Sequence, residues 1–295
     1  MIGPDPTHSL LLSSSETSRN PFFHEACIYL PEHEELYVTS NILQSSSSSQ
    51  LPVILISKLK LRRGGGGPDA AVEQVEWSKL RPPSNMPMPS SGAAFSDGML
   101  FCSQGTLAPG SGGLFYMPRG RPPQAVVTEF FGRDFNSLHD VALRHHPPDD
   151  PAGDGAGRGA ERGRRRRSGS SGGGGGGGSD AGGGGGGGVS FWFTDPCHGF
   201  EQDFRKKPQL PCHVYRFDPE TGDLRVVADG LGRPTGLCFA PDGATLYVTD
   251  SDAVHGDGNQ DATRCVPAPT YLVPFSLPLP LKSPRFAWAP ATGFA

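Results

Sequence analysis

The chain has 295 residues and a formal net charge of −4, because 30 Asp and Glu side chains slightly outnumber 26 Lys and Arg. This balance argues against a dedicated nucleic-acid binder, which would carry an excess of positive charge. Charged residues make up 19% of the chain and apolar residues 35%. These values exclude both a highly charged disordered chain and a bundle of membrane helices.

The N-terminal segment lacks the features of a secretory signal. Its first basic residue is Arg19, and its apolar run at residues 10–12 is too short. The longest apolar tract, residues 271–288, is interrupted by prolines and cannot form the ~20-residue helix that spans a bilayer. The sequence predicts a soluble, cytoplasmic protein that binds no membrane and no nucleic acid.

Four segments have compositions that do not suit a folded core. Residues 1–20 are rich in serine and aperiodic, and residues 44–50 contain a serine run. Residues 148–188 combine an arginine run with two glycine runs, which bury no apolar surface and lose the most entropy on ordering. Residues 265–295 are rich in proline and have no hydrophobic period. We predict a disordered N-terminus, a Gly/Arg-rich disordered insert and a Pro-rich tail.

The remaining sequence has the pattern of short β-strands. Runs of β-branched and aromatic residues occur at 35–40, 191–195, 214–217 and 246–250, and turn signals such as Pro241-Asp242-Gly243 separate such runs. This alternation is typical of antiparallel hairpins. Since no segment shows a sustained 3.6-residue apolar period, the sequence predicts an all-β fold.

A pattern of two strands recurs four times along the chain. Each copy has a small or polar residue, an apolar strand, a turn with Asp, Gly or Pro, and an aromatic strand. The copies begin at Glu25, Gly92, His139 and Thr235. With the insert removed, their spacing approaches the ~40–50 residues of a propeller blade. The repeat therefore predicts a β-propeller.

The cysteines show no spacing typical of a zinc or thioredoxin-like site, because no two of them form a CxxC pair. We expect them to be small buried apolar residues. They are Cys27, Cys102, Cys197, Cys212, Cys238 and Cys265.

Four longer segments carry a resemblance to a known family. They read FHEACIYLPEHEELYVTSN (23–41), GRDFNSLHDVAL (132–143), FWFTDPCHGFEQDFR (191–205) and the continuous stretch 208–251. The chain resembles the senescence-marker protein / gluconolactonase / luciferin-regenerating-enzyme superfamily, in its fungal lactonohydrolase branch. The resemblance covers residues 22–264 apart from the insert.

The resemblance implies a six-bladed propeller that holds one divalent cation, usually calcium, in a central channel. Members of the superfamily hydrolyse lactones. The cation polarises the lactone carbonyl, and a neighbouring carboxylate deprotonates the attacking water. The implied function is thus a calcium-dependent lactone hydrolase that acts on a small-molecule lactone.

The family's site residues can be assigned to this sequence only where its motifs match, position by position. Glu25 matches the family's first-blade metal ligand. His139 stands where the family has a channel asparagine, and Asp140 beside it is retained, so both are assigned to substrate binding. Thr235 replaces a metal-binding asparagine and would be a weak ligand, because calcium prefers carboxylate and amide oxygens.

The family's catalytic aspartate would fall beyond Arg264, where nothing matches, so no catalytic residue is assigned. Residues 21–264 without the insert suffice for about four to five blades of ~40–45 residues. We therefore expect a C-terminally truncated, incomplete ring with a non-homologous tail at 265–295.

Two alternatives to an active hydrolase stay open. The substitutions at His139 and Thr235 also suit a non-catalytic propeller that binds a small molecule or a protein partner. The incomplete ring also suits a chain that forms no stable monomer, since unclosed blades expose strand edges.

Overall fold

The computed structural model describes residues 10–13, 22–44, 52–65, 70–146 and 188–252 and the strand at 271–276. The predicted disordered N-terminus, serine run, Gly/Arg-rich insert and Pro-rich tail lie largely outside these residues. Within the described part, no helix has the length and apolar character needed to cross a membrane.

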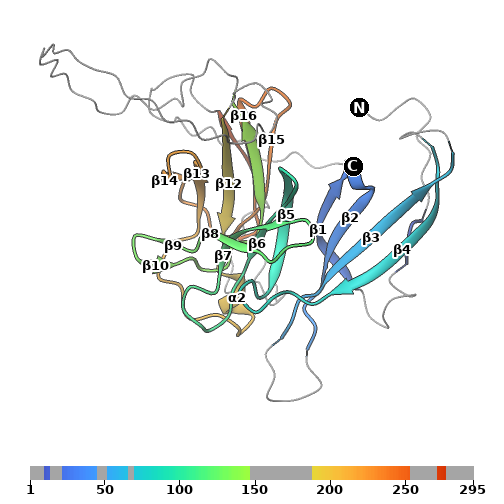
Figure 1. The fold of residues 1–295 in the computed structure, drawn as a ribbon. Helices are drawn as coiled ribbons and strands as arrows, with labels where there is room; N and C mark the ends of the chain where they lie inside the picture. The colour runs from blue at the N-terminus through green and yellow to red at the C-terminus, as the bar shows by residue number, and fades with distance from the viewer. Residues whose placement is uncertain are drawn as a thin grey trace, which may run out of the picture.

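The described chain is built almost entirely from antiparallel sheets, which confirms the all-β prediction (Figure 1). Three sheets have four strands each, a fourth has three, and a short pair completes the set. The first sheet contains β1 (Phe23–Leu30), β2 (Glu35–Ser40), β3 (Ile56–Arg63) and β4 (Val72–Leu80). The second contains β5 (Pro89–Phe95), β6 (Gly98–Ser103), β7 (Gly113–Pro118) and β8 (Gln124–Val127).

The later sheets repeat this order. The short pair is β9 (Glu129–Phe130) and β10 (Arg133–Asp134). The third sheet contains β11 (Val141–His145), β12 (Val189–Asp195), β13 (His213–Phe217) and β14 (Leu224–Ala228). The fourth contains β15 (Pro234–Phe239), β16 (Thr245–Asp250) and β17 (Tyr271–Ser276). The helices are a single 3-10 turn (Pro31–His33) and α2 (His198–Glu201).

Each predicted repeat corresponds to one sheet. Glu25, Gly92 and Thr235 lie on β1, β5 and β15, and His139 lies just before β11, so every repeat begins at the first strand of its sheet. These four strands contact one another in chain order, β1 with β5, β5 with β11 and β11 with β15. The sheets are thus arranged side by side like propeller blades. A six-bladed closed ring and the number of blades stay predictions.

The core lies between neighbouring sheets and follows the period-2 alternation of strands. On β6, Phe101 packs toward Tyr37 of the first sheet, whereas its neighbour Leu100 packs toward Phe191 of the third. On β12, Phe191 packs toward the second sheet and Trp192 toward the fourth. Because both faces of the central sheets are covered, every residue of β6 is buried.

The insert and the tail occupy different positions in this architecture. Residues 147–187 connect β11 to β12, whose ladder pairs His145 with Val189, as expected for an insert between paired strands. Residues 271–276 pair with β16 along its whole length. Part of the predicted tail therefore adds a strand to the fourth sheet, which the sequence analysis did not anticipate.

Candidate functional site

Irregular strand pairing places polar residues where the first strands of the sheets meet. The register shifts within 25–28 of β1, within 89–92 of β5 and within 234–237 of β15. In β1 the irregularity contains Ala26 and Cys27, which have φ values of 75° and 46°. A β-bulge of this kind leaves residues unpaired and re-aims the side chains beside it. Glu25, Ser90 and Thr235 lie at these three irregularities.

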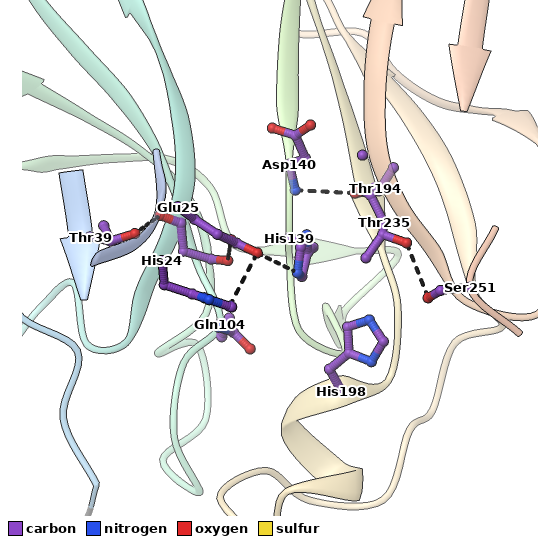
Figure 2. A network of polar contacts seen from close by, with 12 residues as sticks. His24, Glu25, Thr39, Gln104, His139, Asp140, Thr194, His198, Thr235 and Ser251 are labelled. Carbon is purple, nitrogen blue, oxygen red and sulfur yellow. Dashed lines mark hydrogen bonds and ion pairs between the residues drawn. The ribbon is translucent and has the colours of Figure 1, made fainter. Parts of the chain in front are cut away.

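Glu25 forms the central polar contact between three sheets (Figure 2). Its Oε1 lies 3.1 Å from Nε2 of His139, and its Oε2 accepts a 2.6 Å hydrogen bond from the Ser90 hydroxyl. Burial alone would raise the pKa of Glu25, but the hydrogen bonds and the charge of His139 outweigh burial and lower the pKa to about 2. Glu25 is therefore ionised at neutral pH.

A cavity of about 140 Å³ opens at this contact. Glu25 and His139 line it together with hydroxyl and amide side chains, among them Thr39, Asn41, Ser90, Gln104 and Gln202. The Gln104 Oε1 accepts a hydrogen bond from Ser137, which leaves its NH₂ group as the donor end. The described residues thus offer a ligand one carboxylate, the imidazoles of His24 and His139, and several neutral polar groups.

The imidazole of His139 is buried beside opposite charge. Burial alone would lower its pKa, but the hydrogen bond and charge of Glu25 raise it above the ordinary histidine value. Its Nδ1 is buried and has no hydrogen-bond partner among the described residues. These contacts favour the protonated form of His139 and leave its buried Nδ1 without an acceptor among the described residues.

A second histidine lies next to His139. The ring centroids of His139 and His198 are 5.3 Å apart, in an edge-to-face arrangement (Figure 2). Burial lowers the pKa of His198, and the hydrogen bond from Nδ1 to Glu201, at 3.4 Å, opposes this only in part. His198 is therefore neutral at neutral pH. The two imidazoles have pKa values that their surroundings move in opposite directions.

Hydrogen bonds between buried polar groups fix the position of α2 and of His198 within it. The carboxylate of Asp195, at the end of β12, accepts the backbone N–H groups of Asn136 and Ser137 at 3.0 and 2.8 Å. Burial raises the pKa of Asp195 to about 7 despite these bonds. The Ser137 hydroxyl in turn accepts the N–H of Gly199 within α2 at 3.1 Å. The third sheet thereby fixes the loop that carries His198.

Asp140 and Thr235 bind to the protein itself. Asp140 Oδ2 accepts the Leu237 N–H at 3.0 Å and so joins the third sheet to the fourth. The Thr235 hydroxyl contacts Ser251 Oγ at 3.1 Å. Neither residue lines the cavity at Glu25. Of the four predicted site residues, only Glu25 and His139 are therefore brought together at the cavity.

The donors around Glu25 do not fit a calcium ion. Calcium takes six to eight oxygen ligands, usually with several carboxylates. Among the described residues, Glu25 is the only carboxylate that lines the cavity, and an imidazole nitrogen lies beside it. No cluster of three or more His, Cys, Asp or Glu side chains suited to a metal occurs in the part of the chain that is described. Calcium binding stays a prediction, and no chemical step is assigned to it.

The sequence analysis did not single out His198, Ser90 or Gln104. His198 lies inside the matched segment 191–205, but nothing in the sequence indicates that a four-residue helix places it against His139. Ser90 and Gln104 reach the cavity through a bulge and a loop. Only the acidic residue Glu201, one helical turn after His198, could have pointed to a partnered histidine.

The cysteine expectation was wrong for most of the described cysteines. Cys102 is buried, but Cys27 and Cys238 are exposed, and Cys197 and Cys212 are partly exposed. The exposed cysteines lie on strand residues that face solvent, which the sequence pattern alone did not resolve. Cys265 lies outside the described residues.

The fold and site define an all-β protein with repeated four-stranded sheets and a polar, histidine-containing cavity between their first strands. Residues 186–255 match the protein family described as the SMP-30/Gluconolactonase/LRE-like region. The chain therefore carries a region of this superfamily, which confirms the resemblance seen in the sequence motifs.

Curated relatives agree with this assignment. Lactonohydrolase oryL of Aspergillus oryzae (strain ATCC 42149 / RIB 40) is 26% identical over 264 residues, which are 86% of this chain and 45% of the relative. Lactonohydrolase oryH of the same organism is 54% identical over 46 residues, which are 16% of this chain and 10% of the relative. The chain spans less than half the length of these relatives.

A solved structure supports the fold. The gluconolactonase XC5397 from Xanthomonas campestris superposes with a TM-score of 0.51 at 16% sequence identity. The match covers 90% of this chain and 62% of that structure. At this identity the likeness concerns the fold alone.

Proposed function

We propose that the protein is a lactone hydrolase whose reaction centre is the cavity at Glu25 and His139. The observation that carries the proposal is the 3.1 Å contact between these side chains at the cavity wall. It places at the cavity wall a histidine whose protonated form is favoured by Glu25, in a chain whose curated relatives are named lactonohydrolases.

Lactone hydrolysis needs stabilisation of negative charge on the carbonyl oxygen. Water attacks the carbonyl carbon, the oxygen becomes an oxyanion, and the ring C–O bond then breaks. An imidazolium at His139 can donate a hydrogen bond to that oxygen. Glu25 stabilises the imidazolium and is itself a weak base, because its pKa is lowered to about 2.

The attacking water also needs a base. His198 does not line the cavity itself, but its ring centroid lies 5.3 Å from that of His139, and burial lowers its pKa and favours the neutral imidazole. It is therefore the candidate base among the described residues around the two rings. Its Nδ1 faces Glu201, which fixes the other nitrogen, Nε2, as the proton acceptor. Two neighbouring groups whose pKa values are moved apart are a common arrangement for an acid and a base.

The experiment is a pH-stat assay with glucono-δ-lactone and a panel of simple γ- and δ-lactones. We expect release of acid above the spontaneous rate. His139→Gln and His198→Gln should each lower kcat/KM about 10²-fold or more, as expected for loss of an acid or base. His145→Gln, at an exposed position of β11, is the matched control and should leave kcat/KM unchanged.

A wild-type protein that binds a lactone without turnover would contradict the hydrolase and favour the non-catalytic binding propeller. If turnover occurs but both histidine variants retain it, the activity lies elsewhere in the chain. Far-UV circular dichroism of each variant checks that the sheets remain folded.

A further inference from the structure

Two cysteines lie together where the β12–β13 ladder ends. The last residue pair of that ladder is Asp195 with His213. Cys197 follows Asp195 on one strand, and Cys212 precedes His213 on the other. Their thiols form a side-chain hydrogen bond with each other. The sheet itself therefore holds the two sulfur atoms side by side.

The surroundings distinguish the two thiols. Cys197 Sγ donates to Glu201 Oε1 at 3.3 Å, and the same oxygen accepts a 2.7 Å hydrogen bond from Arg233. The hydrogen bond from Cys212 lowers the pKa of Cys197 in spite of burial, whereas the pKa of Cys212 is raised by the same bond and by burial. Cys197 is thus the thiol that ionises first, and the thiolate is the reactive form.

Exposure also suits a reaction with a small molecule. Cys197 and Cys212 are both partly accessible, whereas Cys102 is completely buried.

We propose that Cys197 and Cys212 are a redox modification site, which a low-molecular-weight disulfide such as oxidised glutathione converts to an intramolecular disulfide. The Cys197 thiolate, having lost its proton to solvent, attacks one sulfur of the oxidant and expels one thiolate. Cys212 loses its proton and attacks the Cys197 sulfur of the mixed disulfide, which expels the second thiolate. The two released thiolates take up the two protons, so the protein loses two electrons and two protons and the oxidant gains them.

The disulfide would close the chain segment that contains α2. This segment carries His198, whose Nδ1 is held by Glu201. Closing a loop of this length restricts the unfolded chain. For a domain of this size we expect oxidation to raise Tm by about 5–10 °C. The inference does not depend on the proposed hydrolase activity.

The test uses the full-length wild-type protein, first reduced and then equilibrated with mixtures of reduced and oxidised glutathione. Free thiols are alkylated, and the tryptic peptides are mapped by mass spectrometry. Trypsin cleaves after Arg205 and Lys206, so the two cysteines fall on different peptides. We expect one linked pair, Cys197 with Cys212, and a higher Tm for the oxidised protein.

Serine variants test whether the oxidation-dependent rise in Tm requires Cys197 and Cys212 and not the other cysteines. Cys197→Ser and Cys212→Ser should each abolish the oxidation-dependent rise in Tm. Cys238→Ser removes an exposed cysteine and should preserve both the linked peptides and the rise. Mapping the wild-type protein keeps the test valid even if a serine variant fails to fold.

Three results would overturn the proposal. The pair could stay reduced when the exposed cysteines are fully glutathionylated. The linked peptides could instead join Cys197 or Cys212 to another cysteine, including Cys265. Zinc could co-purify with the chain and protect both thiols from alkylation, in which case the pair would be a metal site and not a redox site.

Discussion

His139 controls the charge at the centre of the molecule. It lies 3.1 Å from Glu25, the carboxylate that the family resemblance assigns to a metal. The hydrogen bond and the charge of His139 stabilise the ionised form of this carboxylate. A cation at Glu25 would therefore have to compete with His139 for the carboxylate.

Calcium binding is therefore expected to depend on residue 139. In wild-type protein, millimolar calcium should shift Tm by less than about 1 °C, because Glu25 is already paired. In His139→Asn, Glu25 loses its cationic partner and gains an amide oxygen nearby, both of which suit calcium. Calcium should then raise Tm by several degrees through preferential binding to the folded state. Differential scanning fluorimetry with and without a chelator measures both values.

The double variant Glu25→Gln/His139→Asn is the control, and its Tm should not respond to calcium. A calcium-dependent rise in wild-type Tm that Glu25→Gln removes would show that further ligands come from outside the described residues. The prediction for residue 139 would then be wrong.

At the scale of elements, strands with strong local signals were predictable and the site was not. The segments 35–40 and 246–250 are flanked by turn residues and became β2 and most of β16. β17 was not predicted because Pro274 lies within it, and a strand tolerates proline only where its N–H is not needed, as at a sheet edge. The bulges that bring Glu25 and Ser90 together depend on strand register, which local sequence does not specify.

The β11–β12 hairpin should tolerate removal of its long connection. His145 pairs with Val189, and the His146 N–H donates to the Gly188 carbonyl at 2.8 Å. We expect that replacing residues 147–187 with Asn-Gly, which forms the two-residue turn that strands prefer, raises the free energy of unfolding by about 2 kcal/mol. The reason is the smaller entropy lost on closing a short loop. Urea unfolding measures the change.

A Gly/Ser linker of the original length serves as the control for that replacement and should leave stability unchanged. If the Asn-Gly protein were less stable than wild type by more than about 1 kcal/mol, residues 147–187 would have to contribute contacts to the folded state. The same result with the Gly/Ser linker would locate those contacts in the side chains of the segment.

At the scale of the whole molecule, stability comes from the packing of one sheet on the next. The sequence repeat predicted four sheets because the same alternation of apolar residues recurs in each copy. In the structure this alternation corresponds to strands such as β6 and β12, whose two faces pack against different neighbouring sheets. A charged contact joins the first two sheets as well. Arg119, which follows β7, donates to both oxygens of the buried Glu35 carboxylate on β2, at 2.8 and 2.7 Å. This contact between distant residues could not be predicted from the sequence.

Glu35 should make stability dependent on pH. Hydrogen bonds from Arg119 lower its pKa despite burial, and Lys58 and Tyr37 add to the effect. A lowered pKa in the folded state contributes stability that is fully present above the unfolded value of about 4.3. This contribution is lost as the pH falls from that value through the lowered pKa of the folded state. We expect Glu35→Gln to lose about 2 kcal/mol at pH 7, less than a fully buried pair would lose because Arg119 stays partly solvated.

Below about pH 4 the difference between wild type and Glu35→Gln should shrink progressively, because the carboxyl is then protonated in the unfolded chain but still ionised in the folded protein. Glu76→Gln is the matched control, since Glu76 pairs with Arg62 at an exposed position and should change stability by less than about 0.5 kcal/mol. Urea unfolding at a series of pH values tests both variants. The loss in free energy of unfolding of Glu35→Gln could instead be the same at every pH. In that case packing, and not the charge of Glu35, would account for its contribution to the contact between the first two sheets.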